Sequence, residues 1–534
     1  MNKVAFRYCT FLISLCAGIC FFSCNKETEL GSGPYFDAPV TAVQFFGKKP
    51  NPVDGKAGDK VSFEVTGVDK LDEGYKFYIN QVQADVVSVT DSLVTVVIPE
   101  ETSSGPASIL TVDGQYFYGP ILKIDGKVSI DNTFKVGSGT NGAIYDVYYN
   151  GSGNGLFVLG GGFTDFNGQS AVKKINGIVK ISSDGTFIDY DAGRGAFGGS
   201  VSTILPVGGQ YYLGGVLSTY ANYSVDGITR VNDDFSIDSS NVTLINPNSE
   251  LNPENDTAWV PTLNAYLSGN VVRLFQDANQ DIIAIGNMTQ YYSYYYEGSQ
   301  KGNYYIDRTA MYNFIKINDS GRLDSSYNFD HTLGYGSRKL NGYISDALQL
   351  PGGKIVFVGS FTKFDGASAP KIGALTDDGL LDQDFASAIG SGADGDIYRI
   401  TYNQTTGKIF VIGDFTHFNG HSANGIAMLN ADGSYDDSFK LKTYSGGAPN
   451  YAGQLNNGLV IVSGSFSQYD GIVRQGFMIL NPDGSLAAGY NNSGAFTGEI
   501  NGLVETSAHS VVIYGLISLF DNVKAGNIVK IAFD

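Results

Sequence analysis

The chain has little of the chemistry on which most enzymes and metal proteins depend. Its 534 residues include four cysteines, four histidines and one tryptophan, and the four cysteines all lie at the N-terminus: Cys9, Cys16, Cys20 and Cys24. Neither a disulfide nor a thiolate metal site can therefore form after Cys24. The sequence also has no Gly-x-Ser-x-Gly elbow, no phosphate-binding loop and no later cysteine nucleophile. We therefore expect no catalytic motif, no metal and no cofactor.

Helical and highly charged segments are scarce as well. After the first 23 residues, no segment longer than two turns shows a helical period. Charged residues make up 16% of the chain, whereas there are 69 Gly, 34 Tyr and 33 Phe. This composition excludes a disordered chain and predicts an all-β, turn-rich globular protein.

One glycine recurs seven times, each time at the end of an apolar run of strand length. The copies begin at Gly161, Gly214, Gly286, Gly359, Gly413, Gly464 and Gly515, with spacings of 53, 72, 73, 54, 51 and 51 residues. A period of this size is typical of a repeat architecture.

The fifth repeat shows the expected content of one unit. The strand Lys408–Gly413 is followed by a turn, a second strand at Gly425–Asn430, the hairpin dipeptide Asp432-Gly433 and a terminal Phe439. Asp-Gly between apolar runs favours a tight hairpin. With one more strand ahead of Lys408, four short strands in about 50 residues make one propeller blade. Seven repeats predict a seven-bladed β-propeller over residues 121–534.

The two ends of the repeat region complement one another. Residues 121–134 resemble the back half of a repeat without a front half, and the C-terminal residues 527–534 stop where such a back half would continue. We expect the N-terminal half-blade to complete the last blade, which leaves no open sheet edge.

Residues 1–23 have the form of a processing signal. Lys3 and Arg7 precede an apolar stretch too short to span a membrane comfortably. The segment resembles a bacterial lipoprotein signal that ends in a lipobox at Phe21-Phe22-Ser23-Cys24, with Phe21 where leucine is usual. The resemblance implies cleavage before Cys24 and lipidation of Cys24. The alternative is an ordinary secretory signal, in which Cys24 is not lipidated.

The residues after Cys24 point to a cell-surface location. Asn25–Glu29 combines a lysine with acidic residues and resembles the surface-export signal of Bacteroidetes lipoproteins, which implies a protein anchored by lipid in the outer membrane and exposed to the medium. Residues 24–37 would form a lipidated tether.

The charge balance restricts the partners. Without the leader the chain holds 32 basic and 53 acidic residues, a net charge of about −21. Nucleic-acid binding depends mainly on Lys and Arg contacts to phosphate, so we expect no nucleic-acid partner. Solubility is the simplest reason for so many acidic residues.

Residues 38–120 lie outside the glycine period. They contain alternating runs such as Lys60–Thr66, Tyr75–Asn80 and Leu93–Pro99, spaced as in a small β-sandwich. Gly58-Asp59-Lys60-Val61, Phe77–Asn80 and Val96–Pro99 resemble the IPT/TIG family of immunoglobulin-like domains. Such domains are usually spacers or protein-contact modules, so we expect a pedestal between the lipid anchor and the propeller.

The repeats themselves resemble the delta-60-type β-propeller repeats of bacterial surface proteins. The similarity lies in the Gly-x-Phe-Thr turn, in Asn430–Ser434 with Phe439, and in Asn481–Ser485. The combination of domains resembles lipoproteins that accompany SusC/SusD-like outer-membrane importers. That family has no assigned catalytic residues to carry over.

The second and third repeats are each about 20 residues longer than the others. Insertions in propellers emerge as loops on one face, where binding residues concentrate. Both flank the third blade, so we expect them to converge. Their aromatic residues are the candidate ligand or partner site: Trp259, Tyr291, Tyr292, Tyr294, Tyr295, Tyr296, Tyr304 and Tyr305. Protein contact, a ligand platform and packing on the protein's own scaffold remain open.

The sequence thus favours a non-catalytic surface lipoprotein, an accessory binding subunit of a SusC/SusD-like uptake system for glycan or peptide. One alternative is a polysaccharide lyase or glycosidase in the central funnel, since paired carboxylates are too abundant to single out. The other is an adhesin or structural surface protein.

Overall fold

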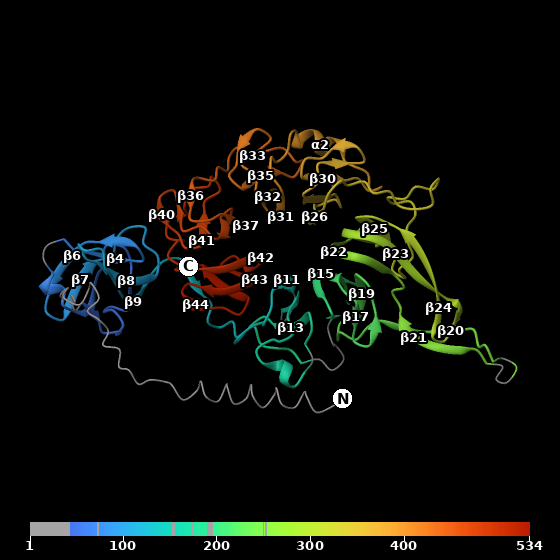
Figure 1. The fold of residues 1–534 in the computed structure, drawn as a ribbon, viewed down its shortest axis with the longest axis horizontal. Helices are drawn as coiled ribbons and strands as arrows, with labels where there is room; N and C mark the ends of the chain where they lie inside the picture. The colour runs from blue at the N-terminus through green and yellow to red at the C-terminus, as the bar shows by residue number, and fades with distance from the viewer. Residues whose placement is uncertain are drawn as a thin grey trace, which may run out of the picture.

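The computed structural model describes residues 43–533 apart from 72–73, 152–154, 174, 190–195, 249 and 251–253. The predicted signal, Cys24 and the tether lie outside the described residues. The protein is all-β, with 52% strand and 3% helix. In Figure 1 a blue N-terminal unit lies beside a ring of sheets coloured from teal to red. Within the described part of the chain, no helix is long and apolar enough to cross a membrane.

The N-terminal unit consists of two sheets around one apolar core. Their strand orders are β1-β3-β7-β6 and β2-β9-β8-β4-β5. In β3, Val61, Phe63 and Val65 are buried and their neighbours are not, as expected for a strand with one face on a core. The strands are β1 (Gln44–Phe45), β2 (Asp54–Gly55), β3 (Lys60–Thr66), β4 (Lys76–Ile79), β5 (Val82–Ala84), β6 (Val86–Val89), β7 (Leu93–Val97), β8 (Gly105–Leu110) and β9 (Tyr116–Ile124).

The end of this unit differs from the predicted boundary at residue 120. Residues 121–124 continue β9, with Leu122 opposite Gly105 of β8 and Ile124 opposite Gly55 of β2. Leu122 and Ile124 are buried in the N-terminal core. A short apolar run fits a repeat strand and a sandwich strand equally well, and the core contacts decide between them. The ring therefore begins after Ile124.

Seven sheets of the described region share one pattern, three antiparallel strands in which the second lies in the middle. We call them ring sheets 1–7. Their strands are β11 (Ile144–Asn150), β12 (Leu156–Gly161), β13 (Ile178–Ser182); β15 (Ser200–Val207), β16 (Gln210–Val216), β19 (Ile228–Asn232); β22 (Tyr266–Gln276), β23 (Ile282–Gln300), β25 (Phe314–Ile317); β26 (Ile344–Gln349), β27 (Ile355–Gly359), β30 (Ile372–Leu375); β31 (Ile397–Asn403), β32 (Lys408–Gly413), β35 (Ile426–Asn430); β37 (Pro449–Gln454), β38 (Val460–Gly464), β41 (Phe477–Leu480); β42 (Thr497–Ser507), β43 (Ser510–Phe520), β45 (Ile528–Phe533).

The fourth strand of each ring sheet is short. In sheets 1–6 it forms a single bridge beyond the hairpin turn, as between Leu429 and Tyr435. In sheet 7 it comes from the other end of the region: β10 (Val128–Ile130) pairs with β45, with Ser129 opposite Ala532. This pairing of the two ends has the form that the sequence led us to expect.

The ring closes at its centre as well. The first strand of each sheet contacts the first strand of the next, and β42 contacts β11. Neighbouring sheets share apolar cores; Val356 and Val358 of β27, for example, pack with Ile397 and Ile400 of β31. Each sheet thereby buries both faces, which a single short sheet cannot do alone. The first strands line the centre of the ring and position the candidate site.

Candidate functional site

Each ring sheet has a β-bulge in its first strand. In sheet 5, Ile397 lies opposite Gly413 and Arg399 opposite Ile412, so that Tyr398 has no partner across the ladder. A bulge breaks the alternation of the strand and redirects a side chain. The seven unpaired residues, here called the bulge residues, are Tyr145, Ser202, Val272, Ser345, Tyr398, Asn450 and Asn501.

The bulges explain the repeated glycine of the sequence. A Cβ at Gly413 would lie 2.0 Å from the carbonyl oxygen of Asp396, just before the bulge. Sheets 1–7 all show this close approach of a carbonyl, at 1.9–2.3 Å from the position a Cβ would take. Only glycine admits it. In the second repeat the residue concerned is Gly215 and not Gly214, the first glycine of the pair.

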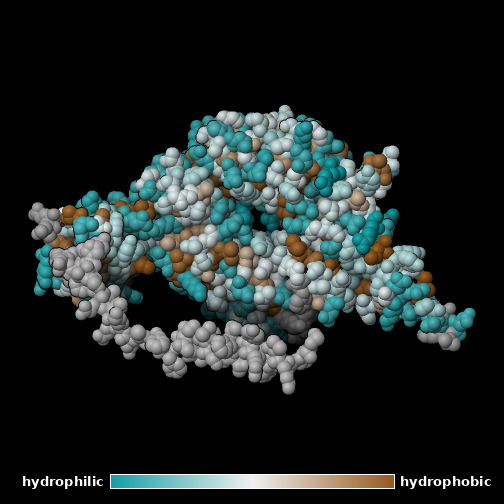
Figure 2. Space-filling view, in the orientation of Figure 1, coloured by the Kyte–Doolittle hydropathy of each residue, from teal (hydrophilic) through white to brown (hydrophobic). Residues whose placement is uncertain are grey.

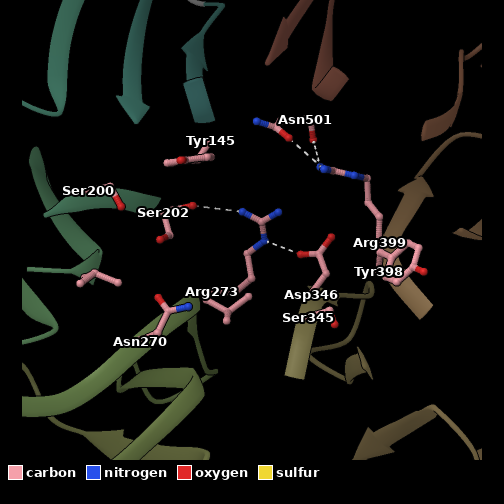
Figure 3. Close-up of a pocket in the computed structure, with 12 residues that line it drawn as sticks. Tyr145, Ser200, Ser202, Asn270, Arg273, Ser345, Asp346, Tyr398, Arg399 and Asn501 are labelled. Carbon is pink, nitrogen blue, oxygen red and sulfur yellow. Dashed lines mark hydrogen bonds and ion pairs between the residues drawn. The ribbon is translucent and has the colours of Figure 1, made fainter. Parts of the chain in front are cut away.

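Six of the seven bulge residues line one cavity of about 320 Å³ at the centre of the ring. Figure 2 shows the hollow there, and Figure 3 shows side chains from several sheets pointing into it. The cavity is also lined by Ser200, Val216, Asn270, Arg273, Asp346 and Arg399. Its size falls within the usual ~300–1,000 Å³ of small-ligand pockets.

Next to the bulge residues, charged side chains form hydrogen bonds from one ring sheet to another. Arg273 Nε donates to Asp346 Oδ1 at 2.9 Å, and Arg273 Nη1 donates to the carbonyl of Ser202 at 3.3 Å. Asp146 Oδ2 accepts from the backbone N–H of Ile204 at 2.7 Å. Burial raises the pKa of Asp146. Burial opposes the charge of Arg273 too, but the carboxylates of Asp346 and Asp146 outweigh this and raise the pKa of Arg273.

Arg399 holds the opposite wall of the cavity. Its Nη1 donates to the carbonyl of Asn501 at 2.7 Å, and its Nη2 donates to Asn501 Oδ1 at 2.8 Å and Glu499 Oε1 at 3.1 Å. Each of the two guanidinium groups therefore has a carboxylate partner. The cavity presents polar groups without a large excess of either charge.

Two buried polar atoms of the cavity wall lack a hydrogen-bond partner among the described residues. They are Asn270 Oδ1 and Arg399 Nε. A buried polar group left unpaired costs about 1–3 kcal/mol. Such atoms are natural hydrogen-bonding positions for a ligand or water.

The accessible side chains of the cavity wall combine aromatic rings with uncharged polar groups. Tyr145 and Tyr398 are 39% and 46% exposed, so that parts of both rings remain accessible. Serine hydroxyls and asparagine amides supply both donors and acceptors. Among the described residues, no three His, Cys, Asp or Glu side chains gather in a way that could hold a metal ion.

Sequence reasoning missed this cavity. The bulge residues differ in type, and each lies 13–16 positions before its glycine, as Ser202 before Gly215 and Tyr145 before Gly161. In six of the seven repeats the signal is a polar or aromatic residue directly after an apolar one, as in Ile397-Tyr398, at a nearly constant place in the repeat; Val272 is the exception. The period contains that signal, but nothing in one repeat alone shows that the strand bulges there.

The two long insertions form hairpins at the rim of the ring. One pairs β20 (Ser239–Leu244) with β21 (Asp256–Pro261); the other pairs the far half of β23 with β24 (Asn303–Ala310). They lie side by side at the right of Figure 1, and the N–H of Ile245 donates to the carbonyl of Ser299 at 2.8 Å. The insertions therefore converge, but they extend outward from the rim.

Four of the eight predicted aromatic site residues pack against one another. They form one cluster with Tyr266, a residue absent from our prediction: Tyr292 and Tyr294 contact the ring of Tyr266, and Tyr296 and Tyr304 contact the ring of Tyr294. The ring centroid of Tyr266 lies 4.9 Å from that of Tyr292 and 5.0 Å from that of Tyr294. Burial raises the pKa of Tyr296 to about 12. We call these five residues the tyrosine cluster; it is a packed support under the hairpin surface.

Tyr291 belongs to the core of ring sheet 3. It is 5% exposed, and its hydroxyl donates to the carbonyl of Gly321 at 2.8 Å. With so little exposed surface, we assign Tyr291 to the core.

Three predicted residues are accessible. Trp259, Tyr295 and Tyr305 are 65%, 57% and 63% exposed. Tyr295 and Tyr305 lie directly opposite one another on β23 and β24, and Trp259 lies on β21 of the neighbouring hairpin. We call these three residues the rim aromatics.

Comparison with known families identifies part of the ring. The family model described as "Domain of unknown function (DUF5122) beta-propeller" matches residues 404–439 and 447–486. These ranges hold most of ring sheets 5 and 6, whose hairpins were the best copies of the predicted repeat. The prediction of β-propeller repeats is confirmed for these residues. No curated protein matches the chain.

Solved structures show only distant similarity. A Bacteroides thetaiotaomicron protein of unknown function shares 12% identity at a TM-score of 0.31, covering 93% of this chain and 98% of its own. An auxiliary nutrient binding protein from Bacteroides ovatus shares 12% identity at 0.30, covering 91% and 97%. The WD40 β-propeller domain of Doa1 shares 14% identity at 0.35, covering 76% and 96%.

Proposed function

We propose that this protein is a non-catalytic cell-surface lipoprotein and an accessory binding subunit of a SusC/SusD-like outer-membrane uptake system for glycan or peptide. In this proposal the seven ring sheets are the blades of a seven-bladed propeller. The N-terminal unit is an IPT/TIG-like pedestal, and acylated Cys24 anchors the protein in the outer membrane.

The observation that carries the proposal is the exposure of the rim aromatics. Interfaces between proteins are enriched in tyrosine and tryptophan, which combine a large apolar face with a polar edge. Trp259, Tyr295 and Tyr305 each leave more than half of their surface uncovered, on two hairpins that this chain adds to the regular repeat. They are therefore suited to contact a partner.

The support beneath the rim aromatics favours a stable contact. The tyrosine cluster packs on the β23–β24 hairpin, which carries Tyr295 and Tyr305. Arg308 lies over Tyr292, with its guanidinium carbon 5.0 Å from the ring centroid. Asn264 Nδ2 donates to the carbonyl of Tyr294, and Asn264 Oδ1 accepts from its N–H. A hairpin ordered in advance loses less entropy on binding.

The position of the hairpins leaves the rim aromatics accessible. In Figure 1 the hairpins extend from the side of the ring away from the N-terminal unit. A protein anchored through its N-terminal unit would therefore present the rim aromatics at its far end, where a partner can reach them.

A pull-down from solubilised outer membranes tests the proposal. We expect the wild-type lipoprotein to retain a large β-barrel protein. The triple variant Trp259→Ala, Tyr295→Ala, Tyr305→Ala should retain about tenfold less, because hot-spot aromatics carry most of an interface's binding energy. Tyr118→Ala is the matched control, since Tyr118 is 70% exposed on the N-terminal unit.

Two outcomes would contradict this assignment. Recovery of the wild-type protein as a lone monomer would count against the importer role. Undiminished retention by the triple variant would show that the rim aromatics are not the contact.

A further inference from the structure

We infer that the central cavity is a binding site for an uncharged, hydroxyl-rich ligand, the end of a neutral oligosaccharide. This inference rests on the proposed function and names its ligand class, and it assigns recognition of the nutrient to a site separate from the rim aromatics. The carrying observations are the charge balance of the cavity, its unpartnered polar atoms and its exposed tyrosine rings.

The charge balance excludes a strongly charged ligand. Arg273 is paired with Asp346, and Arg399 with Glu499. An anion would have to compete with these carboxylates, and a cation would meet carboxylate oxygens that already accept hydrogen bonds. A neutral ligand avoids both costs.

The unpartnered atoms define where hydrogen bonds would form. Arg399 Nε is a donor and Asn270 Oδ1 an acceptor, and both are buried in the cavity wall. The hydroxyls of Ser200, Ser202 and Ser345 lie in the same wall and act in either sense. A ligand must therefore offer donors and acceptors side by side, and a sugar hydroxyl does both at once.

The tyrosine rings supply the apolar contact. Tyr145 and Tyr398 are bulge residues that come from ring sheets 1 and 5, and both line the cavity (Figure 3). A pyranose has one face of C–H groups that packs on an aromatic ring, while its hydroxyls point sideways. Rings on separate sheets, fixed by bulges, fit a rigid ring-shaped ligand better than a flexible peptide.

The cavity also lies at an end of the ring that a ligand can reach. In ring sheets 1, 4, 5 and 6 the first strand begins one residue before its bulge residue, and the second strand ends at the glycine that pairs there. In ring sheet 3 the corresponding pair is Val271 and Gly286. β23 continues beyond Gly286 into the rim hairpin. The cavity and the root of the hairpin thus share one end of the ring.

Calorimetric titration of the detergent-purified lipoprotein tests this site. The probes are maltohexaose, cellohexaose, laminarihexaose, xylohexaose and mannohexaose, with oligogalacturonate and tryptic casein peptides as the charged and peptide comparisons. We expect at least one neutral hexasaccharide to bind, with an affinity that Tyr145→Ala and Tyr398→Ala each weaken about tenfold or more. Tyr398→Phe keeps the ring and should retain most of the affinity.

Control variants separate this site from the importer contact. The triple rim variant should bind the saccharide as wild type does, and Tyr398→Ala should still retain the β-barrel protein in the pull-down. Tyr118→Ala controls for loss of an exposed tyrosine, and equal melting temperatures confirm that Tyr145→Ala and Tyr398→Ala are folded.

Three results would overturn the inference: no neutral hexasaccharide binding at about 10 mM, far above the range of useful affinities; binding only of oligogalacturonate or casein peptides; or saccharide binding that neither tyrosine variant reduces. None of these results would depend on whether the protein associates with an importer.

Discussion

The repeated glycine matters because a carbonyl oxygen occupies the place where a side chain would begin. In ring sheet 1 that oxygen belongs to Ala143, 2.1 Å from the position of a Cβ at Gly161. The next residue, Gly162, would place its Cβ 3.4 Å from Tyr145, an ordinary contact. Two adjacent glycines therefore differ sharply in what they tolerate.

Gly161→Ala should cost about 2–3 kcal/mol of folding free energy, because the strand has to move to admit the methyl group. Gly162→Ala should change stability by less than about 0.5 kcal/mol. Urea unfolding of both variants measures the difference. Equal midpoints for the two variants would show that the bulge yields easily and that the glycine period has another cause.

At this scale the sequence showed which residues recur but not what they face. The period singled out Gly161 and its equivalents, and the reason for it is a carbonyl contributed by a different strand. Tyr291 and Tyr295 are four residues apart in one tyrosine-rich run, yet one is buried and the other exposed. Strand alternation puts both side chains on the same face of β23, so only their positions along the strand distinguish them: Tyr291 reaches the carbonyl of Gly321, whereas Tyr295 lies farther along the hairpin, opposite Tyr305.

Among the elements, β10 has the greatest consequence for its length. Three residues close sheet 7 by pairing with β45, and they join positions near the two ends of the ring. Such closure removes two exposed sheet edges and restricts the chain ends. The pairing of β10 with β45 also connects the last sheet to the segment that follows the N-terminal unit.

Ser129→Pro should weaken the pairing of β10 with β45, because proline has no N–H to donate to the ladder and its ring disturbs a paired strand. We expect a melting temperature lowered by several degrees and faster proteolysis near both ends of the ring. Ser129→Ala, which keeps the N–H, should behave like wild type. If the proline variant matches the alanine variant in both measurements, the pairing adds little to stability.

The sequence located most elements but misjudged some of their partners. The run at 121–124 has the composition of a repeat strand, and its contacts with Gly105 and Gly55 place it in the N-terminal unit. The long insertions were expected on a face of the ring, but they extend from its rim because β20 and β21 pair with each other and meet β23 there. Insertion lengths carry no information about direction.

For the molecule as a whole, the junction between the N-terminal unit and the ring is held by specific hydrogen bonds. The N–H and hydroxyl of Ser104 donate to the carbonyl of Asn492 at 2.9 and 3.0 Å. Asn492 Nδ2 donates to the carbonyls of Ile124 and Val128, at the two ends of the connecting segment. Arg474 Nη1 donates to the carbonyl of Glu101, and burial lowers the pKa of Arg474 to about 10.

Asn492 Oδ1 also accepts from the N–H of Val128 at 3.2 Å. Asn492→Ala should therefore loosen this junction, because it leaves that N–H and the carbonyls of Ile124 and Val128 without this partner, at a cost of about 1–3 kcal/mol. Hydrogen exchange at Val128 should accelerate, and small-angle scattering should show a wider range of molecular dimensions. Asn341→Ala is the control, because Asn341 makes three similar hydrogen bonds to Thr362 and Lys363, in loops next to ring sheet 4 and away from the junction. An unchanged exchange rate at Val128 would mean that other contacts hold the two parts together.

The sequence by itself determined the all-β class, the glycine period and the complementary ends of the repeat region, because these follow from local strand and turn preferences and from spacing along one chain. The tertiary structure alone decided which glycine of each pair faces a carbonyl, which tyrosines are exposed and which residues meet at the centre. Those properties arise from atoms contributed by several sheets at once. Tyr145 and Tyr398 are separated by more than 250 residues, and only closure of the ring makes them neighbours of one cavity.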